Sequence, residues 1–167
     1  MNSLDDRAGC LAECLETLNH SLMELTAVFR VKRKVLAAGD MEGLLELLER
    51  EEKVVEAIFD TESRREMLSQ ELAEATGAAS ERLAQIAESL TPGARDTLFD
   101  CGVRLKTTVE ALLREARIVA MICHAAVEHY EKLIHIITGT GLDCSLYSGD
   151  GQRKTPSAGR SIIDQAV

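Results

Sequence analysis

Residues 36–48 read Leu-Ala-Ala-Gly-Asp-Met-Glu-Gly-Leu-Leu-Glu-Leu-Leu, and this stretch decides the fold. Gly39 can take the left-handed conformation that ends one helix, and Asp40 can cap the start of the next. A junction of two residues forces the flanking helices to run antiparallel. The sequence therefore predicts a helical hairpin, with one helix over residues 4–38 and another over residues 41–76.

The first helix of this hairpin carries an apolar repeat. Two interleaved series recur every seven residues and are broken only at Lys32: Leu4, Leu11, Leu18, Leu25 and Ala8, Leu15, Leu22, Phe29, Leu36. This spacing is typical of a coiled-coil seam. The second helix is more apolar in its first half, so we expect the hairpin to be better buried at its closed end.

Four cations, Arg30, Lys32, Arg33 and Lys34, crowd the last turns of the first helix. They could form a basic patch. We favour a solvated face that complements the negative end of the helix dipole.

A short helix is expected over residues 80–90. Thr91-Pro92 then reads as the N-cap and first position of a last helix that runs to Thr138. Residues 139–167 are rich in Gly and Ser and hold two apolar islands, Leu146-Tyr147 and Ile162-Ile163. Ordering this segment would cost about 1.5 kcal/mol per residue, more than the islands return at up to about 3 kcal/mol per side chain.

The predicted fold class is therefore all-α. We expect an antiparallel long-helix coiled-coil bundle over residues 1–138, with a short extra helix, and a mobile C-terminal tail over residues 139–167.

Composition excludes several classes of partner. The net charge of −9 disfavours nucleic acid and an anionic membrane surface. The longest apolar run, residues 118–123, is far shorter than the ~20 residues of a membrane span. The N-terminal residues lack the features of a secretory signal, and five cysteines without framework spacing fit a reducing compartment. We expect a cytoplasmic protein with no nucleic-acid partner and no membrane insertion.

Candidate metal and catalytic residues are few. Cys10 and Cys14 have ligand spacing, but no second pair completes a zinc site, so we interpret them as buried or half-buried free thiols and Cys123 as core. A stripe on the last helix lies opposite the apolar seam and is interpreted as solvated: His124, Glu128, Glu131 and His135. No phosphate loop or nucleophile motif is present. The sequence predicts no metal, no cofactor and no enzymatic activity.

The last helix is apolar beyond its seam. One seam series runs from Leu98 through Leu105, Leu112 and Val119 to Leu133, and the other includes Val109, Ala116, Cys123, Tyr130 and Ile137. Beside them lie Ile118, Met121, Ile122, Val127, Ile134 and Ile136. Two facing helices could cover a stripe this wide. A surface for a partner helix is the equally weighted alternative.

Three stretches resemble the FlgN-type flagellar export chaperones. Residues 36–55 resemble the family's Gly-Asp hairpin and Leu-rich helix reaching a lysine, here Lys53. Residues 62–68, Glu-Ser-Arg-Arg-Glu-Met-Leu, are similar to its arginine-bearing stretch. Residues 146–152, Leu-Tyr-Ser-Gly-Asp-Gly-Gln, resemble its Tyr-Gly-x-Asp-Gly tail motif, with Ser148 where the family often has Gly.

The resemblance implies a cytoplasmic chaperone that binds hook-associated proteins through their amphipathic terminal helices. It would keep these clients monomeric and deliver them to the flagellar export gate. It implies that Tyr147, with Leu146, docks on the cytoplasmic domain of the gate. The last helix and tail would hold the client, through Ile118, Ile122, Val127, Ile134, Ile136, Ile162 and Ile163. The alternative is a generic coiled-coil adaptor or structural dimerisation protein, and a homodimer stays open.

Overall fold

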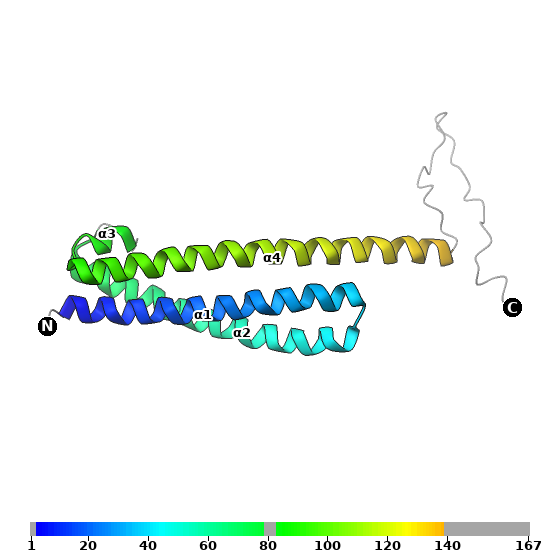
Figure 1. Cartoon of the computed structure of the whole chain (residues 1–167), viewed down its shortest axis with the longest axis horizontal. Helices are drawn as coiled ribbons and strands as arrows, with labels where there is room; N and C mark the ends of the chain where they lie inside the picture. The colour runs from blue at the N-terminus through cyan, green and yellow to red at the C-terminus, as the bar shows by residue number, and fades with distance from the viewer. Residues whose placement is uncertain (1–2, 79–82, 139–167) are drawn as a thin grey trace, which may run out of the picture. The chain divides into compact units, whose positions relative to one another are not determined.

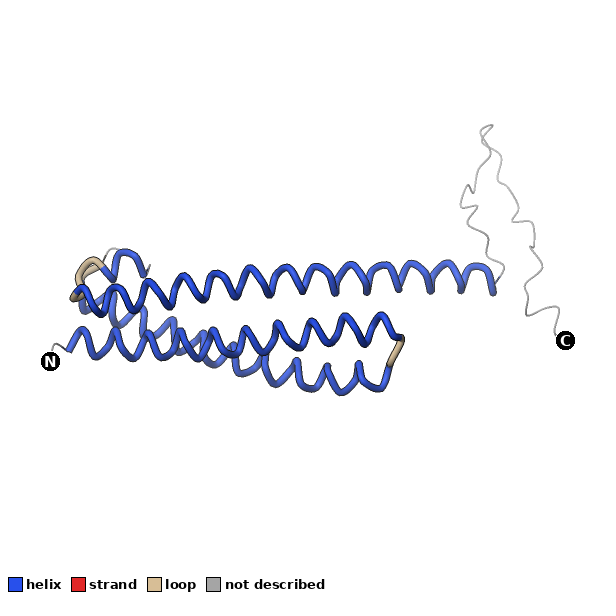
Figure 2. Tube along the Cα trace, in the orientation of Figure 1, coloured by secondary structure: helices blue, strands red, loops and turns tan. Residues whose placement is uncertain are grey.

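The computed structural model describes residues 3–78 and 83–138. They form four helices: α1 (Ser3–Ala38), α2 (Met41–Thr76), α3 (Leu83–Ala87) and α4 (Pro92–Thr138). Within these ranges only the junctions are not helical and no strand occurs (Figure 2). The all-α prediction is confirmed. The predicted tail, residues 139–167, lies outside the described residues. By contacts the chain divides after Ala120 into two units, and α4 crosses the division.

The hairpin between α1 and α2 forms at the predicted junction. Gly39 has φ +68°, and its N–H donates to the Leu36 carbonyl at 3.2 Å. The Gly43 N–H donates to Asp40 Oδ1 at 2.9 Å, so Asp40 caps α2 as expected. A second left-handed glycine, Gly77, ends α2. The two helices run side by side from this junction (Figure 1).

Helix α1 contributes more buried residues than any other described helix. Its predicted seam is confirmed at Leu11, Leu18 and Leu25, which are all buried. Ala12 and Val28, outside the predicted series, are buried as well. The burial extends around α1 because two helices pack on it, as its hydrogen bonds to each show. The Cys14 thiol donates to the Thr61 carbonyl of α2 at 3.5 Å. The Thr108 hydroxyl of α4 donates to Asn19 Oδ1 at 2.6 Å.

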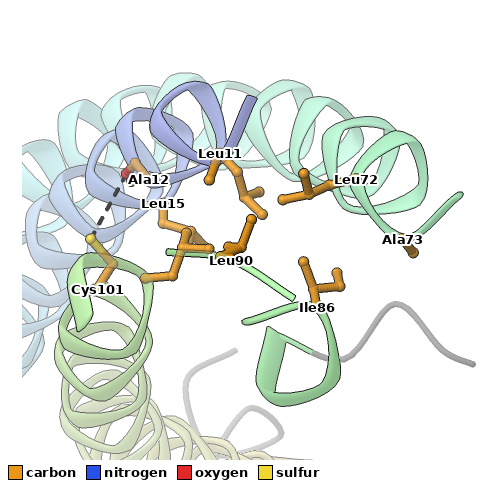
Figure 3. Close-up of a cluster of buried hydrophobic side chains, with 10 residues drawn as sticks. Leu11, Ala12, Leu15, Leu72, Ala73, Ile86, Leu90 and Cys101 are labelled. Atoms are coloured by element: carbon orange, nitrogen blue, oxygen red, sulfur yellow. Dashed lines mark hydrogen bonds between the residues drawn. The ribbon is translucent and has the colours of Figure 1, made fainter. Parts of the chain in front are cut away.

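The main core lies at the open end of the hairpin. Its members come from all four helices and the turn before α4: Ala8, Leu11, Ala12, Leu15, Leu72, Ala73, Ile86, Leu90, Leu98 and Cys101. In Figure 3 the side chains of Leu11, Leu72 and Ile86 point toward one another beside Leu90. The predicted burial at the closed end is therefore wrong, and Leu45, at 63% exposed, is typical of that end. At the open end α3 adds Ile86 to the core as a further layer, and within the described residues no short helix covers the closed end in the same way.

Three of the four cations of α1 form ion pairs that the sequence did not predict. Arg30 and Arg33 both reach Glu115 of α4, at 3.2 and 3.3 Å, and Lys32 pairs with Glu51 of α2. The interpretation as a solvated face is wrong for Lys32, whose side chain is only 14% exposed, whereas Arg30 is 58% exposed, as predicted. These ion pairs join the last turns of α1 to both neighbours.

The short helix differs from its predicted bounds. Its described part ends at Ala87, where residues 80–90 were expected, and residues 79–82 lie outside the described ranges. The N–H groups of Ser89 and Leu90 donate to the carbonyls of Ile86 and Ala87 in a turn, at 3.2 Å each. The turn places Leu90 in the core although it is not helical.

Helix α4 begins at Pro92 as predicted, and the Arg95 N–H donates to the Thr91 carbonyl at 2.9 Å. The Thr91 hydroxyl donates to Asp5 Oδ1 of α1 at 3.1 Å. The residue expected to be an N-cap therefore joins the start of α4 to the start of α1.

The position of the core predicts unequal effects of leucine truncation along α2. Leu72→Ala removes a fully buried side chain and should lower the free energy of unfolding by about 2–5 kcal/mol. Leu45→Ala at the closed end should cost less than about 0.5 kcal/mol. Urea denaturation followed by circular dichroism measures both. Equal losses of unfolding free energy in the two variants would contradict a core at the open end of the hairpin.

Alanine substitutions of Gly39, at the hairpin junction, and of Gly9, inside α1, should change the stability of the protein in opposite directions. Gly39→Ala should destabilise by about 1 kcal/mol, because φ +68° strains an L-residue although space for the methyl group is free. Gly9→Ala, inside α1 with no atom near the new methyl group, should stabilise by about 0.5–1 kcal/mol. Thermal unfolding of both variants tests this contrast, which two shifts of the same sign would contradict.

Candidate functional site

The first half of α4 is held against α1 by apolar and polar contacts. Leu98 and Val119 are buried. Arg104 pairs with Glu16 of α1 and also donates to the Cys101 sulfur at 3.4 Å. The expected seam residues Leu105 and Leu112 are only half-buried, so the predicted seam is confirmed in part. These contacts fix which face of α4 turns toward α1 within the first unit.

The four cysteines in the described ranges form no candidate catalytic or metal centre. Burial raises the pKa of the Cys14 thiol, and the nearby Arg64 guanidinium only partly offsets this effect. Burial likewise raises the pKa of Cys101. Both thiols are therefore protonated near neutral pH and are weak nucleophiles. Cys10 is exposed, contrary to the expectation of burial, and Cys123 is half-buried rather than core. Across residues 3–78 and 83–138 no group of three or more candidate ligands could hold a metal ion.

The polar stripe of α4 is solvated, as predicted. His124, Glu128, Glu131 and His135 are all exposed. His124 Nε2 lies 3.3 Å from Glu128 Oε1, a contact within one helix face. At 3.6 residues per turn these four side chains span a sector of only about 60°. This stripe marks the polar side of α4.

The apolar side of α4 beyond Ala120 is broad. Ile122 and Ile136 flank the predicted seam on one side, and Val127 and Ile134 flank it on the other. By helical geometry the seam and both flanks together span about 180° of the helix circumference. A helix that covers one neighbour needs a stripe of roughly 100°. The apolar circumference that one neighbouring helix would leave uncovered therefore lies on both flanks of the seam.

Most of this apolar side is exposed. Of the predicted client-binding residues, Val127, Ile134 and Ile136 are 55%, 58% and 63% exposed. Ile118 and Ile122 are half-buried. The remaining predicted site residues, Leu146, Tyr147, Ile162 and Ile163, lie outside the described residues.

Three residues of α4 that were expected in the seam are also exposed. They are Tyr130, Leu133 and Ile137, whose side chains are 64%, 39% and 46% exposed. Helix length is the sequence signal that could have found Tyr130. A helix of 47 residues cannot be covered along its whole length by helices of 36. Together with the three exposed flank residues, these three seam residues form the surface called here the α4 stripe: Val127, Tyr130, Leu133, Ile134, Ile136 and Ile137.

None of the described helices combines the length and apolar character needed to cross a membrane. Comparisons with curated proteins and with solved structures gave no match. The family model described as FlgN protein matches residues 8–155, which include all four helices from Ala8 onward. The helical hairpin, the long last helix with its exposed apolar side and this match together show that the chain belongs to the FlgN family of flagellar export chaperones.

Proposed function

We propose that the chain binds hook-associated proteins in the cytoplasm, keeps them monomeric and delivers them to the flagellar export gate. The observation that carries this proposal is the exposed α4 stripe on a helix of a flagellar chaperone family. Contiguous exposed apolar surface is uncommon on monomers and typically marks an interaction site. The mechanism is occlusion without catalysis.

The client is proposed to contribute an amphipathic terminal helix. Such a helix lays its apolar face on an apolar surface through anchors at i, i+3, i+4 and i+7. Val127, Tyr130 and Ile134 follow this spacing on α4. Ile118 and Ile122, on the same helix, are also proposed as client-binding residues. Ile162 and Ile163 are proposed to contribute from the C-terminal segment.

Delivery is proposed to depend on Tyr147, with Leu146 beside it. The family match extends to residue 155 and therefore includes both residues, whereas Ile162 and Ile163 lie beyond it. A tyrosine in a Gly- and Ser-rich segment supplies a large contact area with few rotatable bonds. These properties suit an anchor that docks on the cytoplasmic domain of the export gate.

Charged substitutions in the client surface should weaken client binding. Ile134→Lys and Ile122→Lys should each lower the affinity for a hook-associated protein of the same organism by about 2 kcal/mol, as loss of a hot spot does. Helicity should persist, most clearly for Ile134→Lys, because Ile134 is exposed. Calorimetric titration gives the affinities and circular dichroism gives the helicity.

The matched control is Glu131→Lys, which introduces the same side chain on the polar side of the same helix. It should bind the client as the wild type does. If client binding survives both isoleucine substitutions, the client binds to another face of the chain. Wild-type self-association that these substitutions abolish, without client binding, would favour the structural dimer instead.

Tyr147→Ala should separate delivery from client binding. We expect unchanged helicity and client affinity, and a loss of about 2 kcal/mol or more in binding the gate's cytoplasmic domain. Tyr147→Phe, which keeps the ring, should retain most of the affinity. Calorimetric titration of the chaperone–client complex with the purified gate domain measures both variants. Equal affinities for wild type and Tyr147→Ala would remove Tyr147 from the mechanism.

A further inference from the structure

The first half of α2 carries an exposed apolar face in addition to the side that packs on α1. We call it the α2 outer face, and its members are Met41, Leu45, Leu48, Val55 and Phe59. Four of them are between 43% and 70% exposed, and Val55 is half-buried. Val54, the buried residue in this half of α2, precedes Phe59 by five residues, or about 140° around the helix. Helix α3 lies at the opposite end of the hairpin (Figure 1).

The α2 outer face has the spacing of a coiled-coil seam. Its members follow one another at intervals of four, three, seven and four residues, and Glu52 stands at the skipped position. From Met41 to Phe59 the face is roughly 27 Å long, or five helical turns. A partner helix with anchors at i, i+3 or i+4, and i+7 can therefore lie along it.

One flank of the α2 outer face is acidic. Glu42, Glu49 and Glu56 recur every seven residues beside the seam, and Glu52 lies within it. All four are exposed, and none forms an ion pair with another described residue.

The cations near this face do not neutralise it. Lys53 is the only cation that lines the open hollow formed with Glu49, Glu52 and Glu56. Arg50 pairs with Glu24 of α1 at 2.9 Å. The acidic flank is therefore available to cations of a partner.

We propose that the α2 outer face binds a basic amphipathic helix of another protein. Apolar anchors of that helix would pack between Met41 and Phe59, and its flanking lysines or arginines would face Glu49 and Glu56. Covering Glu52 without a cation opposite it would leave a buried, unpaired carboxylate, which is costly. Glu52 therefore selects a partner that has a cation at the facing seam position. This surface belongs to the first unit and is separate from the α4 stripe.

The same charges disfavour a second copy of this chain as the occupant. In an antiparallel pair of outer faces the two glutamate flanks would face each other, and in a parallel pair the two copies of Glu52 would meet in the seam. Like charges brought together in an interface cost free energy. A partner of opposite charge avoids this cost.

Two synthetic peptides of three heptads test the proposed chemistry. Both carry Leu at the seam positions. The basic peptide has Lys at the flanking positions and at the central seam position, and the acidic peptide has Glu there. We expect the full-length chain to bind the basic peptide at least about tenfold more tightly than the acidic one. Fluorescence anisotropy with labelled peptide at nanomolar concentration gives the affinities. Equal affinities would overturn the inference.

Substitutions locate the peptide on the chain. Leu45→Ser combined with Phe59→Ser should weaken binding of the basic peptide by about tenfold or more. Both residues are exposed, so helicity should persist. Met67→Ser is the matched control, because Met67 lies on α2, is also exposed and is not part of the outer face. It should bind within about twofold of the wild type.

A second set of variants leaves the apolar residues intact and keeps the test decisive if the serine variant loses helicity. Glu49→Gln combined with Glu56→Gln should weaken binding of the basic peptide by about fivefold. Glu71→Gln combined with Glu110→Gln removes the same charge from exposed positions elsewhere in the first unit and should have little effect. Equal losses in the two double variants would overturn the inference, because binding would then follow net charge alone.

Three further outcomes would assign another occupant or another site, and each would overturn the inference. Ile134→Ser would weaken peptide binding in place of the outer-face variants if the peptide bound the α4 stripe. A wild-type dimer that the Leu45→Ser, Phe59→Ser variant converts to monomers in sedimentation would indicate a second copy. A gain of about tenfold in peptide affinity on deletion of residues 139–167 would indicate the chain's own C-terminal segment. Because the probes are peptides of stated composition, the result is independent of whether the chain binds hook-associated proteins.

Discussion

Burial of the leucine seam of α1 is the constraint on which the rest of the first unit depends. One neighbouring helix cannot cover Leu11, Leu15 and Leu18 together with the flanking Ala12 and Val28, all of which are buried. Helix α2 covers one side because the Gly39-Asp40 junction returns the chain along α1. The first half of α4 covers the other side, where Thr108 bonds to Asn19. The central helix is thus shared, and each outer helix depends on it for its buried surface.

Because α2 and α4 both pack on α1, a third side of α1 remains to be covered. At the open end α3 closes it with Ile86, and the following turn adds Leu90. Beyond Leu83, Leu18 and Leu22 of α1 remain buried. Toward the closed end, ion pairs take over from apolar packing, since Glu115 meets both Arg30 and Arg33. Arg30 is 58% exposed, so solvent screening limits what this pair contributes to stability, although Glu115 is only 14% exposed.

Local signals allowed much of the fold to be predicted from sequence. Gly39, Gly77 and Pro92 impose backbone conformations that end or begin helices, so the bounds of α2 and α4 and the end of α1 were predicted correctly. Long-range packing carries no such local signal. The periodicity of α2 could not reveal that Leu72 would meet Ile86, because that contact depends on where a later element packs. For the same reason the pairing of Arg30 with Glu115 was missed. The candidate site was predictable where helical periodicity defines a face, as for Val127 and Ile134.

The α4 stripe lies on a helix that is already formed, and this lowers the entropy that the chaperone loses when a partner binds. Isolated short helices are marginal in water, but α4 is continuous from Pro92 to Thr138 and its first half is anchored on α1. Helix propagation from an anchored segment avoids the nucleation cost. A client that docks on Val127 and Ile134 therefore orders mainly its own chain, while the chaperone surface is organised in advance.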